Sequence, residues 1–219
     1  PMWSVEFFPS QDGPSHLYNA LIIQEYYNSA EFPAFQRHYD LDLRPMPNWV
    51  GHAIMASLMI ICEPLTAEKL MLSSYVLLFL FAGRYLIMSV DPSKHPLALL
   101  LFPFVYNHFL QKGFYNFVFS LGFCMLAIGF WWRHHHQLKM KHAVLFNLIM
   151  VCCYFSHMVS TVIALLAVAI LWLVTLRPSH FKRHLVQIPL LLPACFLPVW
   201  FITAHGAESN EVYGSMWSS

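Results

Sequence analysis

The chain has 219 residues, of which 58% are hydrophobic and only 11% are charged, and its formal net charge at pH 7 is +1. Soluble domains contain about 45–50% apolar and about 25% charged residues, so this composition argues against a disordered chain and an ordinary soluble enzyme. The near-zero net charge provides no basic field, and no nucleic-acid partner is expected. The composition indicates an integral membrane protein.

A membrane-spanning helix needs about 20 mostly apolar residues, so a chain of this length has room for roughly six or seven spans. The expected fold is therefore all-α, a polytopic transmembrane helical bundle. The chain begins at Pro1 without an initiator Met, and no signal peptide is expected within the 219 residues given. Residues 204–219 are polar. We expect them to be a truncated outer segment of a longer membrane protein.

Residues 1–47 form an acidic and aromatic-rich segment that precedes the apolar part of the chain. Six of the eleven acids lie here, namely Glu6, Asp12, Glu25, Glu31, Asp40 and Asp42. A helix is predicted from about residue 12 to 28, because Asp12 or Ser15 suits its cap and Pro14 suits its first turn. Leu17 and Leu21 lie on one side of this helix, which suits a helix on the membrane surface. We therefore predict that residues 1–47 are an outer juxtamembrane loop with amphipathic helices.

Residues 48–203 are predicted to be the transmembrane helical domain. Its apolar runs cover residues 48–62, 70–88, 97–110, 115–132, 143–176 and 185–203. As one helix, residues 143–176 would extend about 51 Å, far beyond a hydrocarbon core of about 30 Å. We therefore predict two legs that turn near Ser156 and His157.

Two basic loops predict the orientation. Residues 133–142 and 177–184 contain Lys and Arg but no acid, so both are expected on the cytoplasmic side. Residues 1–47 are then non-cytoplasmic, with 48–62 and 70–88 as successive crossings. This path leaves 97–110 as a re-entrant or shallow helix pair on the outer side.

Asp12 and His16 are the candidate catalytic residues. They lie four residues apart on one helix face, where the carboxylate could act as a general base. The alternatives are that Asp12 only caps the helix and that His16 is an ordinary surface histidine.

The segment from Asp40 to Arg44 offers a candidate metal and phosphate site. Asp40 and Asp42 have the spacing of a carboxylate pair that shares Mg²⁺ or Mn²⁺, and a solvated loop is the alternative. Arg44 is placed to bind a lipid phosphate, or to act as an interface anchor whose head reaches water.

Further polar side chains are predicted near the outer membrane face, where an unpaired polar group is costly. The candidate substrate-binding residues among them are His52, Asn107, His108 and His157. Each could instead be hydrogen-bonded to a neighbouring helix. His134, His135 and His136 lie in a basic loop and are interpreted as solvated.

The order of these features resembles the GT-C superfamily of polytopic membrane glycosyltransferases. The matching segments are Asp12-Gly13-Pro14-Ser15-His16-Leu17-Tyr18, Pro47-Asn48-Trp49-Val50-Gly51-His52, Ala67-Glu68-Lys69-Leu70 and Tyr154-Phe155-Ser156-His157. The likeness rests on layout and short motifs. It implies transfer of a sugar from a polyprenyl-phosphate donor to an acceptor hydroxyl at the outer face, with Asp12 as the essential acid of the first outer loop. Membrane lipids and a lipid-linked sugar donor are the implied partners.

This chain departs from the commoner pattern of two adjacent acids, because Gly13 follows Asp12. General base is therefore the simpler role for Asp12 than a metal bridge. The alternative function is a non-catalytic transporter or flippase subunit for a lipid-linked glycan. Clustering of Asp12, His52, His108 and His157 around one outward cavity would favour the enzyme, whereas a polar track through the membrane would favour the transporter.

Overall fold

The computed structural model describes residues 2–28, 30–177 and 181–204. Within these ranges every regular element is a helix, which confirms the all-α prediction. Residues 205–219, predicted to be an outer polar segment, lie outside the described part of the chain. The elements are η1 (Met2–Ser4), α1 (Gly13–Glu25), α2 (Phe35–His38), α3 (Val50–Leu58), α4 (Pro64–Val90), η2 (Pro92–Leu101), α5 (Phe102–Val105), α6 (His108–Gln111), α7 (Tyr115–His134), η3 (His135–Gln137), α8 (Met140–Ser156), α9 (Met158–Val174) and α10 (Phe181–Leu191).

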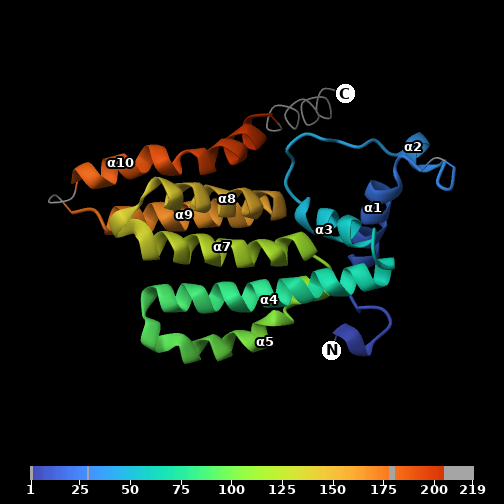
Figure 1. The fold of residues 1–219 in the computed structure, drawn as a ribbon, viewed down its shortest axis with the longest axis horizontal. Coiled ribbons are helices and arrows are strands. Elements are labelled where there is room, and N and C mark those ends of the chain that lie inside the picture. Colours follow the sequence, from blue (N-terminus) through green and yellow to red (C-terminus); the bar gives the residue numbers. More distant parts are fainter. Residues whose placement is uncertain (1, 29, 178–180, 205–219) are drawn as a thin grey trace, which may run out of the picture.

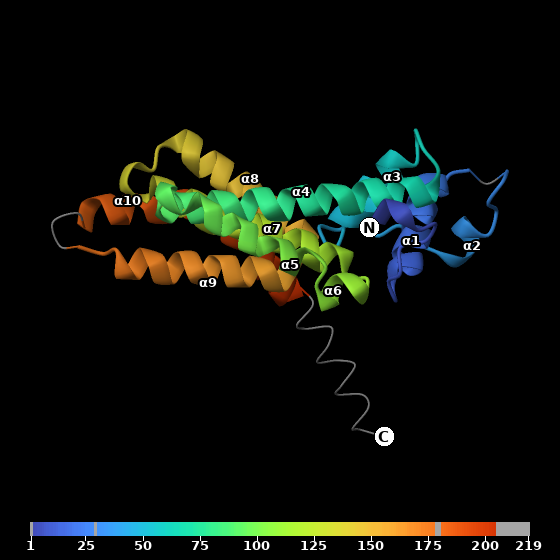
Figure 2. The ribbon, with the colours of Figure 1, turned by 90° about the horizontal axis from the view of Figure 1, so that it is seen from below.

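The long helices lie side by side with their axes nearly parallel, and α1, α2 and α3 gather at one end (Figure 1). Helix α7 is the central element, because it packs against α4 on one side and against α8 and α9 on the other. One core cluster joins α1, α3, α4 and α7, and a second joins α7, α8, α9 and α10. Figure 2 shows α4 extending between the two ends of this bundle.

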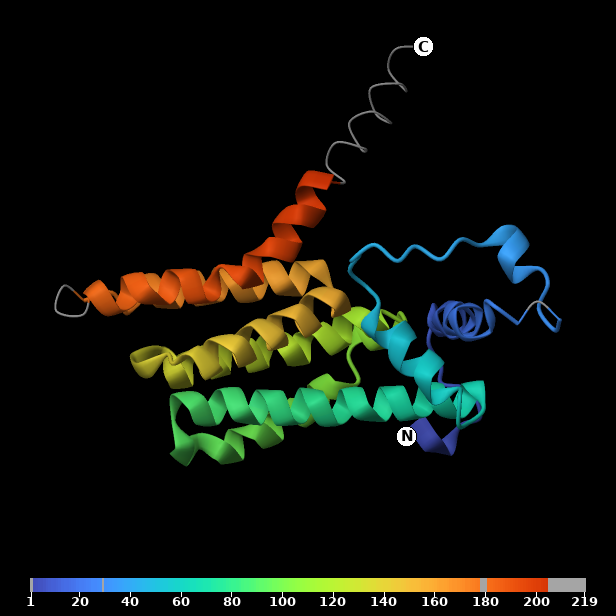
Figure 3. The same ribbon diagram turned by 45° about the horizontal axis from the view of Figure 1, so that its top comes forward.

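Two helices are long and apolar enough to cross a membrane: α4, and α7 together with η3. A third candidate is the pair His184–Leu191 and Pro193–Ala204, bent by 49°, and Figure 3 shows the chain turning away from the bundle there. Helices α8 and α9 have 17 residues each, about 26 Å, slightly short of a hydrocarbon core of about 30 Å.

The outer faces of these helices are apolar. Helix α9 alone exposes Val159, Val162, Ile163, Leu166, Ile170, Leu173 and Val174. A continuous apolar surface of this size is costly in water and is typical of a face that contacts lipid or another apolar partner. Exposure and helix length together indicate membrane association.

The predicted first crossing over residues 48–62 is wrong. Helix α3 covers only nine residues, about 14 Å, and so it is too short to span. Helix α4 then begins at Pro64, earlier than the predicted start at residue 70, because a proline is favourable in a first helical turn. Glu68 and Lys69 therefore lie inside α4 and do not precede it.

The segment 92–111 also differs from its prediction. It starts at the end of the bundle remote from α1 and returns antiparallel along α4: Leu101 packs on Gly83, and Tyr75 Oη donates to the Val105 carbonyl at 2.9 Å. The predicted re-entrant pair on the outer side is therefore wrong. Pro96 and Pro103 remove backbone donors from this segment, which explains why it forms short 3₁₀ and α pieces.

The predicted division of residues 143–176 is confirmed. Helix α8 ends at Ser156, α9 begins at Met158, and His157 between them is extended, with φ −164° and ψ 130°. The His157 side chain accepts from Val159 N at 3.3 Å and so caps α9. The turn thus places His157 at the end of the bundle where α1 lies.

Helix α1 begins one residue after Asp12, as predicted, but the Asp12 side chain makes no capping hydrogen bond. Leu17 and Leu21 pack against the first core cluster, because α1 lies against α3 and α4. The predicted amphipathic position of this helix on the membrane surface stays a prediction.

The acidic segment and the basic loop 133–142 lie at opposite ends of the bundle. Helix α4 runs away from α1, residues 92–111 return, and α7 runs away again to the basic loop (Figure 1). The sequence predicts the same separation, but by a different path. It expects residues 48–62 to cross, whereas in the structure they do not cross and residues 92–111 run back along α4. Which end faces the cytoplasm stays a prediction.

Gly13 allows α1 to approach the bundle closely. A Cβ at this position would overlap Ser10 Oγ and Tyr115 Oη and lie 2.9 Å from Glu68 Oε1. We predict that Gly13→Ala costs about 1–3 kcal/mol through overpacking. At about 2–4 °C per kcal/mol for a chain of this size, the unfolding midpoint of the purified protein should fall by several degrees.

Ser15→Ala is the matched control, because Ser15 is an exposed residue of the same helical turn. Its unfolding midpoint should stay near that of the wild type. A Gly13→Ala protein as stable as the Ser15→Ala protein would show that α1 does not pack this closely.

Candidate functional site

A pocket of about 320 Å³ lies at the end of the bundle that carries α1. Four parts of the chain form it: the start of α1, the segment leading into α3, the start of α7 and the junction of α8 with α9. Its lining residues are Asp12, His16, Asn48, His52, Phe114, Asn116, Phe117 and His157. Four of the predicted site residues therefore meet in one place: Asp12, His16, His52 and His157.

His16 and His52, 36 residues apart in the sequence, are joined by a hydrogen bond of 2.8 Å between His16 Nδ1 and His52 Nε2. The other nitrogen of His52, Nδ1, lies 3.1 Å from the Asn48 carbonyl oxygen. A carbonyl only accepts, so His52 Nδ1 carries a proton. When His52 is neutral, its Nε2 accepts from His16.

Asn48 and Asn116 form the frame that holds His52. Asn48 has a φ of 69°, a left-handed conformation that asparagine tolerates better than most residues. Asn116 Nδ2 donates to the Asn48 carbonyl at 2.8 Å, and Asn116 Oδ1 accepts from Gly51 N at 2.7 Å. The start of α7 thus fixes the first turn of α3, and with it the position of the His52 ring.

Beneath His16 lies a buried polar cluster made of Ser10, Glu68 and Tyr115. Tyr115 Oη donates to Glu68 Oε1 at 2.5 Å and lies 2.7 Å from Ser10 Oγ. The Tyr115 ring stacks on His16 with ring centroids 5.3 Å apart. The Glu68 residue is only 4% exposed. Its carboxyl group is therefore part of the support of the pocket.

Asp12 is held in place through its backbone. Its N–H donates to the Lys112 carbonyl at 3.1 Å, and Gln11 N donates to the Gln111 carbonyl at 2.9 Å. Gly113, with φ +85°, packs so closely that a Cβ would lie 2.7 Å from Asp12 N. This contact requires glycine both for its conformation and for its size.

Burial lowers the pKa of both histidines. For His16, the lowering by burial outweighs the opposing effects of the Asp12 carboxylate and of a hydrogen bond with the Gly113 backbone. Burial, assisted by the neighbouring His16, lowers the pKa of His52 to about 4, against an opposing hydrogen bond to the Asn48 backbone. Both rings are therefore neutral near pH 7.

The pair nevertheless has a place for one additional proton. The hydrogen bond of His16 with the Gly113 backbone raises its pKa, so it is one in which a ring N–H donates. The bond between the rings and the bond to Asn48 use both N–H groups of two neutral rings. A third proton would let His16 also donate toward the Gly113 backbone, and the negative charge of Asp12 favours that proton.

Asn107 and His108 do not join this pocket. Asn107 caps α6 by accepting from Leu110 N at 3.1 Å, and its Nδ2 lies 3.2 Å from Tyr75 Oη. His108 is exposed and contacts the Phe109 ring. The bond of Asn107 with α4 is of the kind that the alternative interpretation gave it, and a substrate-binding role for Asn107 and His108 stays a prediction.

The predicted metal and phosphate site has a different arrangement. Arg44 Nη2 forms an ion pair with Asp42 Oδ2 at 2.8 Å, and Arg44 Nε lies 3.0 Å from both Asp42 oxygens. Asp40 is exposed. In the described part of the chain, no group of three or more His, Cys, Asp or Glu residues is arranged to hold a metal ion. Mg²⁺ or Mn²⁺ at Asp40 and Asp42 therefore stays a prediction.

The sequence reasoning missed Asn116 and the support role of Glu68. Asn116 is a polar residue within an otherwise apolar run, and this pattern is the available signal for it, whereas Glu68 stands beside Lys69. No family model, curated protein or solved structure matches the chain. Function is therefore inferred from the geometry of the site.

The lowered pKa values predict a loss of stability in acid. The unfolded chain binds protons at these rings below about pH 6.5, whereas the folded protein resists protonation until the pH falls further. Stability should therefore decrease as the pH falls from about 6.5 toward 4. His52→Gln should reduce this decrease, measured by unfolding midpoints across that range.

His108→Gln is the control, since His108 is exposed outside the pocket, and it should keep the wild-type pH dependence. If His52→Gln and His108→Gln proteins lose stability equally as the pH falls, the buried His52 ring is not the cause.

Proposed function

We propose that the protein is a membrane glycosyltransferase that moves a sugar from a polyprenyl-phosphate donor to an acceptor hydroxyl at the outer membrane face. The observation that carries this proposal is the meeting of Asp12, His16 and His52 in one pocket at the end of an apolar helical bundle. The volume of about 320 Å³ lies at the lower end of the range for small-molecule sites.

In the proposed reaction the acceptor hydroxyl oxygen attacks the anomeric carbon of the sugar. A carbon–oxygen bond forms there, and the bond from the anomeric carbon to the phosphate oxygen breaks. The polyprenyl phosphate leaves with the electron pair of that bond. The hydroxyl proton passes to the His16–His52 pair, and the Asp12 carboxylate stabilises the resulting cation.

The proposed base is the His16–His52 pair, whereas the sequence alone predicts Asp12 for that role, with His16 beside it. Burial lowers both pKa values, so both rings are unprotonated near pH 7 and can accept a proton. Asp12 then acts electrostatically on His16.

The pocket is also suited to a substrate that is partly apolar. Phe114 and Phe117 form its apolar wall, and the Phe117 ring meets His157 edge-on at 5.1 Å between centroids. Aromatic faces of this kind contact sugar rings and prenyl units. The pocket thus offers a polar side for the reacting groups and an apolar side for the lipid end of the donor.

The transporter or flippase subunit is the second candidate, and the placement of the polar residues favours the enzyme. Asp12, His52 and His157 gather in a single pocket at one end, although His108 lies outside it. A transport pathway would instead place polar side chains through the thickness of the bundle.

The test is sugar transfer by the full-length protein in membrane vesicles, with radiolabelled polyprenyl-phosphate-linked hexoses as donors. We predict that Asp12→Asn and His16→Gln each lower the rate at least about 100-fold, the magnitude typical for loss of general acid–base catalysis. The rate should also fall in acid, as the histidine pair gains its third proton.

Glu6→Gln and His38→Gln likewise replace a carboxylate and a histidine, but at exposed positions outside the pocket, and should keep the wild-type rate. Transfer at the wild-type rate by the Asp12→Asn protein would contradict the proposal. A wild-type protein that moves lipid-linked glycan between leaflets without transferring sugar would favour the transporter.

A further inference from the structure

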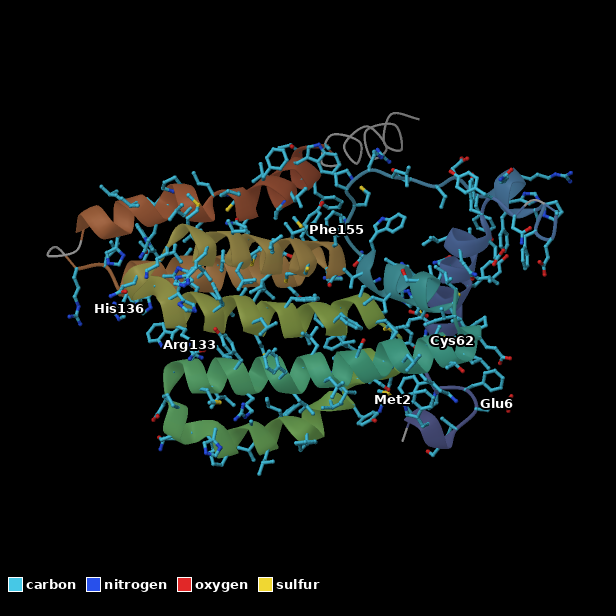
Figure 4. All side chains as sticks on the ribbon, viewed as in Figure 1. Met2, Glu6, Cys62, Arg133, His136 and Phe155 are labelled. Atoms are coloured by element: carbon cyan, nitrogen blue, oxygen red, sulfur yellow. The ribbon has the colours of Figure 1, made fainter. Side chains whose placement is uncertain are left out.

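A second pocket lies at the opposite end of the bundle from Asp12 and His16, and the proposed sugar transfer does not use it. Its volume is about 420 Å³. The end of α7 with η3, the end of α9 and the start of α10 form it, through Trp132, His135, His136, Val174, Thr175, Arg177 and His184. Figure 4 shows His136 and Arg133 at this end, and Cys62 and Glu6 at the other.

This end of the molecule is strongly basic. Residues 92–204 contain no Asp or Glu at all. Within that stretch, the basic side chains near the pocket come from Arg133, Lys139, Lys141 and Arg177. Asp91, at the end of α4, uses its carboxylate to accept from Ser93 N and Oγ. The positive charge around the pocket therefore has no matching acid on the elements that form it.

His184 provides an independent indication of a ligand. It is 5% exposed and lines the pocket, yet its Nδ1 is buried without a hydrogen-bond partner. Buried polar atoms are paired in the great majority of cases, and an unpaired one requires an explanation. A group that enters the pocket and hydrogen-bonds to this ring would provide the missing partner.

The remaining lining residues indicate the chemistry of that group. His135 is fixed by stacking on Trp131, with centroids 5.0 Å apart, and its Nδ1 lies 2.6 Å from the Trp132 carbonyl. Arg177 adds a planar guanidinium whose paired donors match phosphate oxygens. Trp132 has an amphipathic side chain and Val174 an apolar one. Both suit the boundary between a headgroup and an acyl chain.

We propose that this pocket binds a phosphate group through Arg177 and His184. The phosphate belongs either to the headgroup of an anionic phospholipid or to a free phosphate compound, since both present the same anionic oxygens. Basic side chains at the end of an apolar bundle attract anionic headgroups. The site is separate from the pocket of Asp12 and His16, so it does not depend on the proposed sugar transfer.

The experiment is native mass spectrometry of the full chain released from neutral detergent. The protein is titrated with phosphatidylglycerol, with phosphatidylcholine as the uncharged lipid control, and separately with inorganic phosphate. We expect phosphatidylglycerol to bind more tightly than phosphatidylcholine. Arg177→Gln should weaken that binding about tenfold, as loss of a charge-assisted hydrogen bond implies.

Lys141→Gln is the matched control, because it removes one positive charge from the same end without changing the pocket. It should keep the wild-type affinity.

His184→Gln should weaken binding as Arg177→Gln does. If the His184→Gln protein does not fold, the variant of the exposed Arg177 still provides the test. Saturable binding of inorganic phosphate that is lost in Arg177→Gln would support the site with a free phosphate compound as its ligand. Equal affinities for the two lipids without phosphate binding, or equal losses in Arg177→Gln and Lys141→Gln, would overturn the proposal.

Discussion

The hydrogen bond from Tyr115 Oη to Glu68 Oε1 joins the starts of α7 and α4 inside the protein, where a carboxyl group without partners would be costly. Ser10 contacts the same hydroxyl, and Gly13 leaves the space that this arrangement needs. This polar cluster therefore helps to attach the N-terminal segment to the bundle. The His16 ring stacks on Tyr115, so the position of the pocket depends on this attachment.

The two ends of the bundle have opposite chemical character. At one end, backbone carbonyls, asparagines and the Asp12 carboxylate surround a pair of neutral histidines. At the other end, histidines and Arg177 surround a pocket on elements that contain no acid. Between them lie apolar helices with little charge. This distribution separates the proposed proton chemistry from the proposed phosphate binding, which lie at opposite ends of one membrane-associated protein.

Local sequence predicted features that depend on chain length and on residue type, and it did not predict features that depend on distant contacts. The turn at His157 followed from a run too long for one span, and the start of α1 followed from the residues around Asp12. Residues 48–62 are apolar enough to resemble a span, but Pro64 begins α4 and leaves α3 short. The return of residues 92–111 depends on contacts such as Tyr75 with Val105, which local pattern does not contain. Likewise, the sequence places Asp12, His16, His52 and His157 near one face of the membrane but does not show that they share a pocket. Asn116, which holds His52, gives only a weak signal in the sequence.

The most direct test of the candidate site is the detection of the hydrogen bond between His16 and His52 by nitrogen NMR of the histidine-labelled protein, with resonances assigned through His16→Gln and His52→Gln. A through-bond coupling between His16 Nδ1 and His52 Nε2, with both rings neutral near pH 7, is the expected result. Two uncoupled rings that each titrate independently near the ordinary histidine pKa of about 6.5 would contradict the hydrogen-bonded pair of His16 and His52. They would also contradict the proposed chemistry of the pocket.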